Sequence, residues 1–404
     1  MNGLSFLATH REQSLFTSDL RTCSSQIENE IIDKRILVIG GAGSIGSATV
    51  HEIVSFQPAA LHVVDVNENN LAELVRGLRS SNQVFDVPDF RTLPLDFGST
   101  VMQRFIVEQP PYDMILNFAA IKHVRSEKDV YSILQMIDTN VLKPARLLNW
   151  VAEKGGTKAY FCVSTDKAAN PVNLMGASKR LMEHVIFSDT ESSGATVRAT
   201  SARFANVAFS DGSLLYSWIK RLEKRQPLAV PKTTRRFFIS LQEAGKICLI
   251  AAVCAKDRHL LIPRLSPDTD LQELQPIAEG FLRNHGYEPR HYESETEAKA
   301  NIVSDIADAK YPLLITPLNT SGEKSYEEFV GEGEYVVETG LADLLAVQHK
   351  PCDRDIFLKF LSTARKWVDD PLIPISKNEI VSAISSVIKE LAHQESGRNL
   401  DERM

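Results

Sequence analysis

Three side chains that can move protons stand in consecutive positions: Thr165, Asp166 and Lys167. A second amine follows at Lys179. A hydroxyl, an acid and amines are useful together where protons leave and join neighbouring atoms of a substrate. An apolar run before these residues predicts a buried strand, and apolar residues at helical spacing after them predict a helix. We therefore expect the strand to deliver the first three side chains to the carboxyl edge of a sheet, where open α/β sheets bind ligands, with Lys179 beside them on the helix.

A glycine-rich turn follows the first predicted strand, residues 35–39. Gly40, Gly43 and Gly46 stand in this turn, and residues 47–54 predict a helix directly after it. Glycines at this spacing allow a tight turn, a close approach of the backbone to a pyrophosphate, and close packing of the helix on the strand. The helix N-terminus also favours an anion. We expect a dinucleotide to contact Gly40, Gly43, Ser44, Ile45 and Gly46.

Acidic residues end the next two predicted strands. Asp65 lies 19 residues after the last glycine of the turn, where a carboxylate takes the adenosine ribose hydroxyls. Because that carboxylate repels a 2′-phosphate, the expected cofactor is NAD and not NADP. Residues 93–97 predict a third strand, whose Asp96 could accept from the adenine amino group with Phe97 against the ring. A plain turn acid is the alternative interpretation of Asp96.

The fourth predicted strand, 114–120, ends in two small residues, Ala119 and Ala120. Their size lets a flat cofactor lie against the backbone. Lys122 and His123 follow at the same edge, so Lys122 is a candidate for contacts with both cofactor and substrate. His123 can titrate near neutrality and is a candidate for the substrate, with a solvated loop histidine as the alternative.

Asn140 is a polar residue among the apolar positions of a predicted helix, 131–152. A buried amide needs hydrogen-bond partners. We expect Asn140 to brace the neighbouring cofactor-binding loop and not to react.

The alternation of strands and helices predicts an α/β fold, a doubly wound parallel sheet of the Rossmann type, with a smaller mixed substrate-binding region and a helical C-terminal extension. The predicted units are an irregular, polar N-terminal leader at 1–33, an NAD-binding domain at 34–264, a substrate-binding region at 265–340 and the extension at 341–404. Residues 205–235 are expected to contribute to the substrate site.

The composition narrows the class of protein. The chain has 404 residues and a net charge of -7, with no long basic run, which argues against nucleic acid as a partner. No apolar run approaches the roughly 18 residues of a membrane span, and the N-terminus does not read as a signal peptide. Five scattered cysteines show no paired metal-ligand spacing, so no metal site is predicted. These features favour a reduced, cytoplasmic enzyme, and we expect a homo-oligomer.

With these residues in place, the chain resembles the extended short-chain dehydrogenase/reductase family. Within that family it is most similar to the nucleotide-sugar 4,6-dehydratases of bacterial polysaccharide and glycan biosynthesis. The resemblance covers about 34–329. It rests on the glycine turn, on the runs at 119–124, 164–168, 173–180 and 203–207, and on Gly-Glu-Lys-Ser-Tyr-Glu-Glu at 322–328. The Thr-Asp-Lys run together with Lys-His-Val is the part specific to dehydratases.

The resemblance implies that bound NAD takes hydride from C4 of a UDP-N-acetylhexosamine, with UDP-N-acetylglucosamine as the expected substrate. Lys167 would then be the base at C5, Asp166 the acid at the departing C6 hydroxyl, and Lys179 the partner of the nicotinamide ribose. Return of the hydride to C6 makes the overall reaction a loss of water. Family analogy places the nucleotide diphosphate and base on Asn206, Arg235 or Arg236, Glu323 and Lys324.

Two positions depart from the pattern of the wider family. Met175 stands where that family has a proton-accepting tyrosine, four residues before Lys179, and Ala205 stands where glycine is common. Met175 stays a substrate-binding candidate, but a thioether cannot take the C4-hydroxyl proton, so Thr165 becomes the candidate acceptor. A C4 or C5 epimerase of nucleotide sugars is the alternative enzyme, and a non-catalytic NAD-binding sensor is the alternative outside catalysis.

Overall fold

The computed structural model describes residues 3–82, 85–188, 197–317 and 326–393. Within them, nine strands form one sheet in the order β15-β16-β11-β6-β5-β4-β1-β2-β3. The strands from β3 to β11 are parallel, while β16 and β15 add an antiparallel edge. Their bounds are β1 (Arg35–Ile39), β2 (Ala60–Val64), β3 (Asp89–Leu93), β4 (Met114–Asn117), β5 (Ala159–Val163), β6 (Arg198–Ala202), β11 (His259–Pro263), β15 (Tyr335–Glu338) and β16 (Leu344–Gln348).

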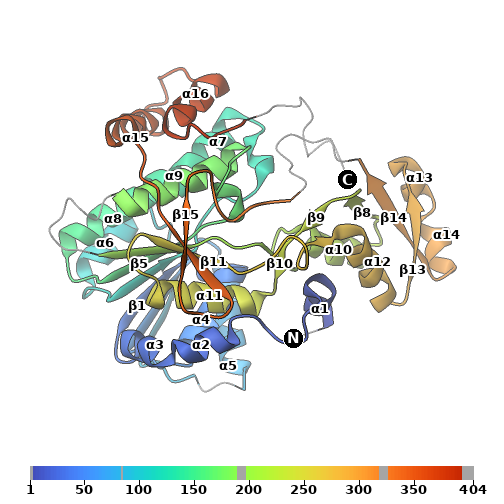
Figure 1. Cartoon of the computed structure of the whole chain (residues 1–404), viewed down its shortest axis with the longest axis horizontal. Coiled ribbons are helices and arrows are strands. Elements are labelled where there is room, and N and C mark those ends of the chain that lie inside the picture. Colours follow the sequence, from blue (N-terminus) through green and yellow to red (C-terminus); the bar gives the residue numbers. More distant parts are fainter. Residues whose placement is uncertain (1–2, 83–84, 189–196, 318–325, 394–404) are drawn as a thin grey trace.

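Helices cover both faces of this sheet, which confirms the predicted doubly wound α/β architecture. Figure 1 shows α4 and α11 on one side of the sheet and α8 and α9 on the other. The flanking helices are α4 (Ser44–Val54), α5 (Glu68–Ser80), α6 (Thr100–Glu108), α7 (Val130–Ile137), α8 (Lys143–Lys154), α9 (Leu174–Ser188) and α11 (Leu241–Cys254). Strand order reverses between β1 and β4, so the carboxyl ends of these two strands open the crevice where such folds bind ligands.

Two predicted elements lie elsewhere in the structure. The third strand ends at Leu93, whereas 93–97 was the expected strand; Pro94 has no N–H to give to a ladder, which explains why pairing stops there. The single helix expected at 131–152 is divided by a π-helical turn, η2 (Asp138–Leu142), which carries Asn140 between α7 and α8.

A smaller region packs around a second core that includes Trp218, Phe281 and Leu313. Its three-stranded parallel sheet has the order β13-β14-β8. The elements are β8 (Leu228–Pro231), β13 (Glu288–Tyr292), β14 (Lys310–Thr316), α10 (Leu214–Glu223), α12 (Leu274–Asn284), α13 (Glu295–Ala300) and α14 (Ile302–Ala307). Two short strand pairs come from the segments that connect this region with the main sheet. They are β7 (Asn206–Val207) with β10 (Phe238–Ile239), and β9 (Arg235–Arg236) with β12 (Gln272–Glu273).

The first 33 residues were expected to be irregular, and that expectation is wrong. They form α1 (Gly3–Thr9), α2 (Thr17–Thr22) and α3 (Ser24–Ile31). Phe16, Ile27 and Ile31 are fully buried in the main core, while α1 packs against α12 of the smaller region. Burial of these few apolar side chains supplies what a short, polar sequence lacks in helix-forming tendency.

The boundary predicted between 340 and 341 falls inside a hairpin. Both of its strands, β15 and β16, belong to the main sheet, with Leu260 of β11 opposite Val347 of β16. The helical extension therefore starts after β16, with α15 (Arg354–Asp369) and α16 (Lys377–Val387). Figure 1 shows these two helices above α9, and α15 also packs against α7. None of the helices in the described residues is long and apolar enough to cross a membrane.

Candidate active site

A cleft of about 690 Å³ opens where the carboxyl ends of β1, β4, β5 and β6 meet. Most of the predicted site residues line it: Gly40, Gly43, Ser44, Ile45, Gly46, Asp65, Asp96, Phe97, Ala119, Ala120, Lys122, His123, Thr165, Asp166, Lys167, Met175, Lys179 and Asn206. Arg235 and Arg236, on β9, are not among its lining residues, and Glu323 and Lys324 lie outside the described residues. The fold thus brings most of the predicted cofactor-binding and catalytic residues together in one cleft, while Arg235 and Arg236 lie outside its lining.

The glycine turn separates positions that the fold itself requires from one that it does not. Gly40 has a φ of +67°, and a Cβ there would lie 2.5 Å from the backbone nitrogen of Ala119. A Cβ on Gly46 would lie 2.3 Å from the carbonyl oxygen of Gly40. A Cβ on Gly43 would meet only that same oxygen, at 3.5 Å, which is an ordinary contact. Packing explains Gly40 and Gly46, whereas Gly43 leaves open space facing the cleft.

The N-terminus of α4 faces the same space. Its N-cap is Gly43, which provides no side chain to accept from the first N–H groups of the helix. These groups and the helix dipole attract an anion. The space next to Gly43 and the uncapped N–H groups together fit a pyrophosphate, and therefore the dinucleotide that the sequence predicts.

Two carboxylates, Asp65 and Asp96, line the cleft after the ends of β2 and β3. Asp65 accepts from the backbone nitrogens of Ala42 at 3.1 Å and Asn67 at 2.9 Å, which holds it at the end of β2. Asp96 accepts from Gly98 N at 2.9 Å and pairs with the Nζ of Lys143 at 2.6 Å. Lys143, from the start of α8, also lines the cleft, and its charge offsets that of Asp96 there.

Thr165, Asp166 and Lys167 follow β5 directly and form one hydrogen-bonded group. The Thr165 hydroxyl donates to Oδ1 of Asp166 at 2.7 Å, and the Nζ of Lys167 donates to the same oxygen at 3.1 Å. The backbone nitrogen of Lys167 is a third donor to it, at 2.9 Å. Oδ2 of Asp166 has no hydrogen-bond partner among the described residues, although the side chain is 2% exposed. That oxygen is therefore available to exchange a proton with a ligand in the cleft.

Lys179 is almost completely buried, at 4% exposure, one side of it lining the cleft. Its ammonium donates to the thioether sulfur of Met182 at 3.2 Å, a weak acceptor. Burial lowers the pKa of Lys179, while the nearby Cys162 and Glu183 act against that change. A buried cation that has only a thioether as its hydrogen-bond partner in the described chain has donors left for the hydroxyls of a bound ribose.

Asn140 ties the loop after β4 to α9. Its Oδ1 accepts from the backbone nitrogen of Ile121, and its Nδ2 donates to the carbonyl oxygen of Ile121, both at 2.9 Å. The same Nδ2 also donates to Ser178 Oγ at 2.9 Å. The π-helical turn directs this amide inward. Lys122, one residue further, donates to the carbonyl oxygen of Asp211 at 2.8 Å and so ties the loop to the opposite wall.

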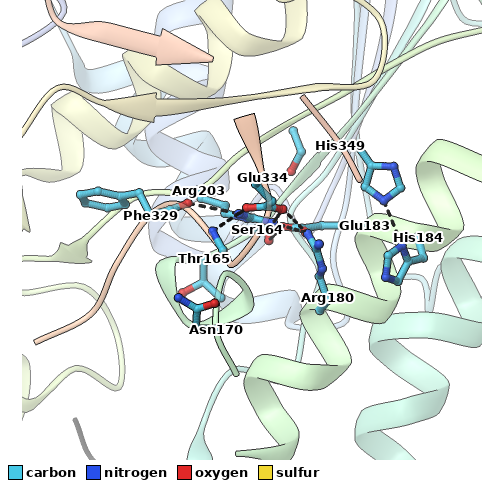
Figure 2. A network of polar contacts seen from close by, with 12 residues as sticks. Ser164, Thr165, Asn170, Arg180, Glu183, His184, Arg203, Phe329, Glu334 and His349 are labelled. Atoms are coloured by element: carbon cyan, nitrogen blue, oxygen red, sulfur yellow. Dashed lines mark hydrogen bonds and ion pairs between the residues drawn. The ribbon is translucent and has the colours of Figure 1, made fainter. Parts of the chain in front are cut away.

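Next to β5 and α9 lies a fully buried network of two arginines and two glutamates, shown in Figure 2. Arg203, at the end of β6, donates to Glu183 of α9 at 2.6 Å and to Glu334 at 2.6 Å. Arg180 contacts the same two carboxylates. Ser164, the neighbour of Thr165, donates to Glu183 at 2.6 Å. Charges balance within the network, which fixes β5, α9 and the segment before β15 relative to one another.

Sequence reasoning missed one carboxylate at the site. Glu327 is 5% exposed, and its Oε1 lies 4.0 Å from the Nζ of Lys167. It stands in the Gly-Glu-Lys-Ser-Tyr-Glu-Glu run, so that run gave a signal, but only Glu323 and Lys324 of it were predicted to bind. A distance of 160 positions separates Glu327 from Lys167, so no local pattern could pair them.

Comparison with known proteins shows to which family the chain belongs. The family described as polysaccharide biosynthesis protein matches residues 36–349. The chain belongs to this family. An uncharacterized membrane protein of Methanocaldococcus jannaschii is 32% identical over 80% of the chain and 87% of its own length. A Campylobacter jejuni UDP-N-acetylglucosamine 4,6-dehydratase (inverting) is 27% identical over 57% of the chain and 67% of its own length. A Rickettsia typhi UDP-glucose 4-epimerase is 23% identical over 75% and 88%.

Some relatives are much longer than the chain, which spans 48% of a probable polysaccharide biosynthesis protein of Bacillus subtilis. Among solved structures, Pen from Bacillus thuringiensis aligns with a TM-score of 0.61 at 22% identity, over 79% of the chain and 87% of its own. The Bordetella bronchiseptica enzyme WbmF, solved in complex with NAD+ and UDP, aligns with a TM-score of 0.52 at 16% identity, over 64% and 80%. These likenesses confirm the fold, and the family match confirms the resemblance found in the sequence.

Proposed function

We propose that the protein is an NAD-dependent 4,6-dehydratase that converts a UDP-N-acetylhexosamine, with UDP-N-acetylglucosamine as the first candidate, to the 4-keto-6-deoxy sugar nucleotide. The observation that carries this proposal is the shared Oδ1 of Asp166, which accepts from both the Thr165 hydroxyl and the side-chain nitrogen of Lys167 in the cleft. Support also comes from a relative named UDP-N-acetylglucosamine 4,6-dehydratase. The fit of the glycine turn and of Lys179 to a dinucleotide supports NAD as its cofactor.

NAD, when bound, accepts hydride from C4 of the sugar and later returns it to C6. Gly43 and the α4 N-terminus would hold its pyrophosphate, Asp65 its adenosine ribose and Lys179 its nicotinamide ribose. The charge of Lys179 also favours removal of a negative hydride from the sugar.

The Thr165–Asp166 hydrogen bond lets the C4-hydroxyl proton reach the carboxylate. As hydride leaves C4, the hydroxyl proton passes to the Thr165 oxygen while the Thr165 proton passes to Asp166, 2.7 Å away. The product is a 4-ketone, a neutral threonine and a protonated Asp166. Met175, which replaces the tyrosine of the wider family, takes no part in this transfer.

The remaining steps return every group to its starting state. Neutral Lys167 removes the C5 proton, which the 4-ketone acidifies, while Asp166 gives its proton to the C6 hydroxyl and water leaves. After hydride reaches C6, the Lys167 ammonium returns a proton to C5. Asp166 is again a carboxylate and Lys167 again an amine, and the sugar has lost one water.

The mass of the product tests this proposal directly. Purified protein incubated with UDP-N-acetylglucosamine and no added reductant is expected to give a product lighter by one water. In D2O that product is expected to carry one deuterium at C5. An unchanged mass with a new sugar stereochemistry would show an epimerase, and no turnover across a panel of nucleotide sugars would favour a sensor.

Two substitutions test the assigned groups. Lys167→Met is expected to abolish dehydration while NAD stays bound, measured as cofactor released on denaturation, because Lys167 is not needed to hold the dinucleotide. The exposed Lys256→Met is the matched control and is expected to keep full activity. Thr165→Val removes the relay hydroxyl and is expected to slow turnover by about a hundredfold or more. An unaffected rate in Thr165→Val would remove that relay from the mechanism.

A further inference from the structure

The chain segment after α16, residues 388–393, lies beyond the part that matches the family, yet it contacts residues that adjoin those lining the cleft. Ile388 is 1% exposed, and Leu391 also packs against the main core. These two apolar side chains anchor the segment. The polar groups between and after them point to three different parts of the site, and the reaction as proposed uses none of them.

The first contact is to the loop between Lys167 and the start of α9 at Leu174. The backbone nitrogen of Ala392 donates to the carbonyl oxygen of Pro171 at 3.1 Å. Pro171 lies four residues after Lys167 in that loop, so the bond limits how far the loop can move away from the cleft.

The second contact reaches the first turn of α9 through a carboxylate. His393 Nε2 lies 3.9 Å from Oε2 of Glu127, and the other oxygen of Glu127 accepts from the backbone nitrogen of Met175 at 2.9 Å. Met175 lines the cleft. Glu127 thus satisfies one of the N–H groups that a helix N-terminus leaves without an intrahelical partner.

The third contact reaches the buried network. Oε1 of Glu390 lies 3.7 Å from Nη2 of Arg180, whose other terminal nitrogen contacts Glu183 and Glu334. Arg180 directly follows Lys179 in α9. Ala392 therefore contacts the loop before α9, and Glu390 contacts Arg180 in the second turn of α9. His393 reaches the first turn of α9 indirectly, through Glu127.

We propose that Glu390, Ala392 and His393 are positioning residues of the active site, which hold the loop at 168–173 and the start of α9 in the geometry that catalysis needs. The effect on turnover rests on the proposed function, while the effect on the loop does not. A single hydrogen bond or partly exposed ion pair contributes little to global stability, but here each acts on the same short segment.

Two shortened chains isolate these contacts. A chain ending at His393 keeps all three, and a chain ending at Leu391 keeps both apolar anchors but lacks Ala392 and His393. Hydrogen–deuterium exchange is measured at the amides of 170–177, with those of β1 as the internal reference. We expect exchange at 170–177 to be about tenfold faster in the chain ending at Leu391, with β1 unchanged, and the turnover number to fall by a similar factor.

Point variants repeat the test in the full chain. His393→Gln and Glu390→Gln are expected to speed exchange at 170–177 in the same direction, whereas the exposed Lys389→Gln is the control and is expected to change nothing. Equal exchange at 170–177 in the two shortened chains would overturn the proposal. Faster exchange in β1 as well would also overturn it, because the segment would then only stabilise the fold. If no chain turned over any nucleotide sugar, the proposed function would fail, and the exchange comparison would still decide the positioning role.

Discussion

Replacing Glu183 with glutamine is expected to lower the free energy of unfolding by about 3 kcal/mol at pH 7. Glu183 is fully buried, and burial by itself raises its pKa. The charges of Arg203 and Arg180 and the bonds from Arg203 and Ser164 outweigh burial and hold the pKa at about 2, against an ordinary 4.5. At about 1.4 kcal/mol for each pKa unit, this depression corresponds to about 3 kcal/mol in favour of the folded state. Loss of one partner from a buried ion pair has a similar effect, about 3–5 kcal/mol.

The same depression fixes the dependence on pH. Because the folded-state pKa lies below the unfolded one, the contribution of Glu183 is complete above pH 4.5 and disappears as the pH falls toward about 2. A glutamine cannot titrate. The difference in stability between the wild type and Glu183→Gln is therefore expected to be largest at neutral pH and to shrink steadily below pH 4.5.

Urea unfolding followed by tryptophan fluorescence, repeated from pH 7 down to pH 3, measures this difference. Glu223→Gln is the matched control: Glu223 forms an exposed ion pair with Lys220 on α10, so its loss is expected to leave the unfolding midpoint unchanged. An unfolding free energy of Glu183→Gln within about 1 kcal/mol of the wild type at pH 7, or a difference that does not vary with pH, would refute the reasoning.

The remaining predictions concern the dinucleotide. Gly43→Ala is expected to keep the melting temperature but to lower the amount of NAD retained on purification, because its Cβ would meet only Gly40 O, at 3.5 Å, and would fill the space beside the α4 N-terminus. Gly46→Ala is expected to lower the melting temperature, because its Cβ would lie 2.3 Å from that same oxygen; equal melting temperatures for the two variants would contradict this distinction. Lys179→Met removes a buried cation whose pKa burial lowers, so thermal stability is expected to be kept while turnover falls about a hundredfold or more; a destabilised Lys179→Met would show that the ammonium serves the fold.

Local sequence patterns predicted the sheet well where strands are parallel and buried on both faces. β1 after Arg35 and all of β5 are continuous apolar runs, and β2 is apolar except for His62, since helices cover both sides of these strands. The glycine turn was predictable because all the residues that define it lie within one strand, one turn and one helix that follow each other in the sequence. Asp65, at the end of β2, required only the spacing from that turn.

Elements that depend on distant partners were not predictable. Edge strand β15 has mostly exposed side chains, so its sequence lacks the apolar pattern of a strand. It pairs with β16, and β16 joins the main sheet by pairing with β11, which lies about 70 residues before β15 in the chain. Glu334 reads as one acid in a polar segment, although it is buried against Arg203, 131 positions away. Phe16 gave no helical pattern because its burial depends on the main core and not on its neighbours.

The arrangement around Asp166 is also the reason why we propose dehydration rather than epimerisation. An epimerase that inverts C4 has to hold one proton from the C4 hydroxyl and return it to the same oxygen, so it needs only one group that stores this proton. Loss of the C6 hydroxyl requires the stored proton to be delivered to a different oxygen of the sugar. In the proposed reaction Asp166 would meet that need, because its Oδ1 accepts from Thr165 while its Oδ2 has no partner in the described chain. The amine of Lys167 donates to the same carboxylate, and in the proposed reaction it would take the proton from C5, which lies between C4 and C6.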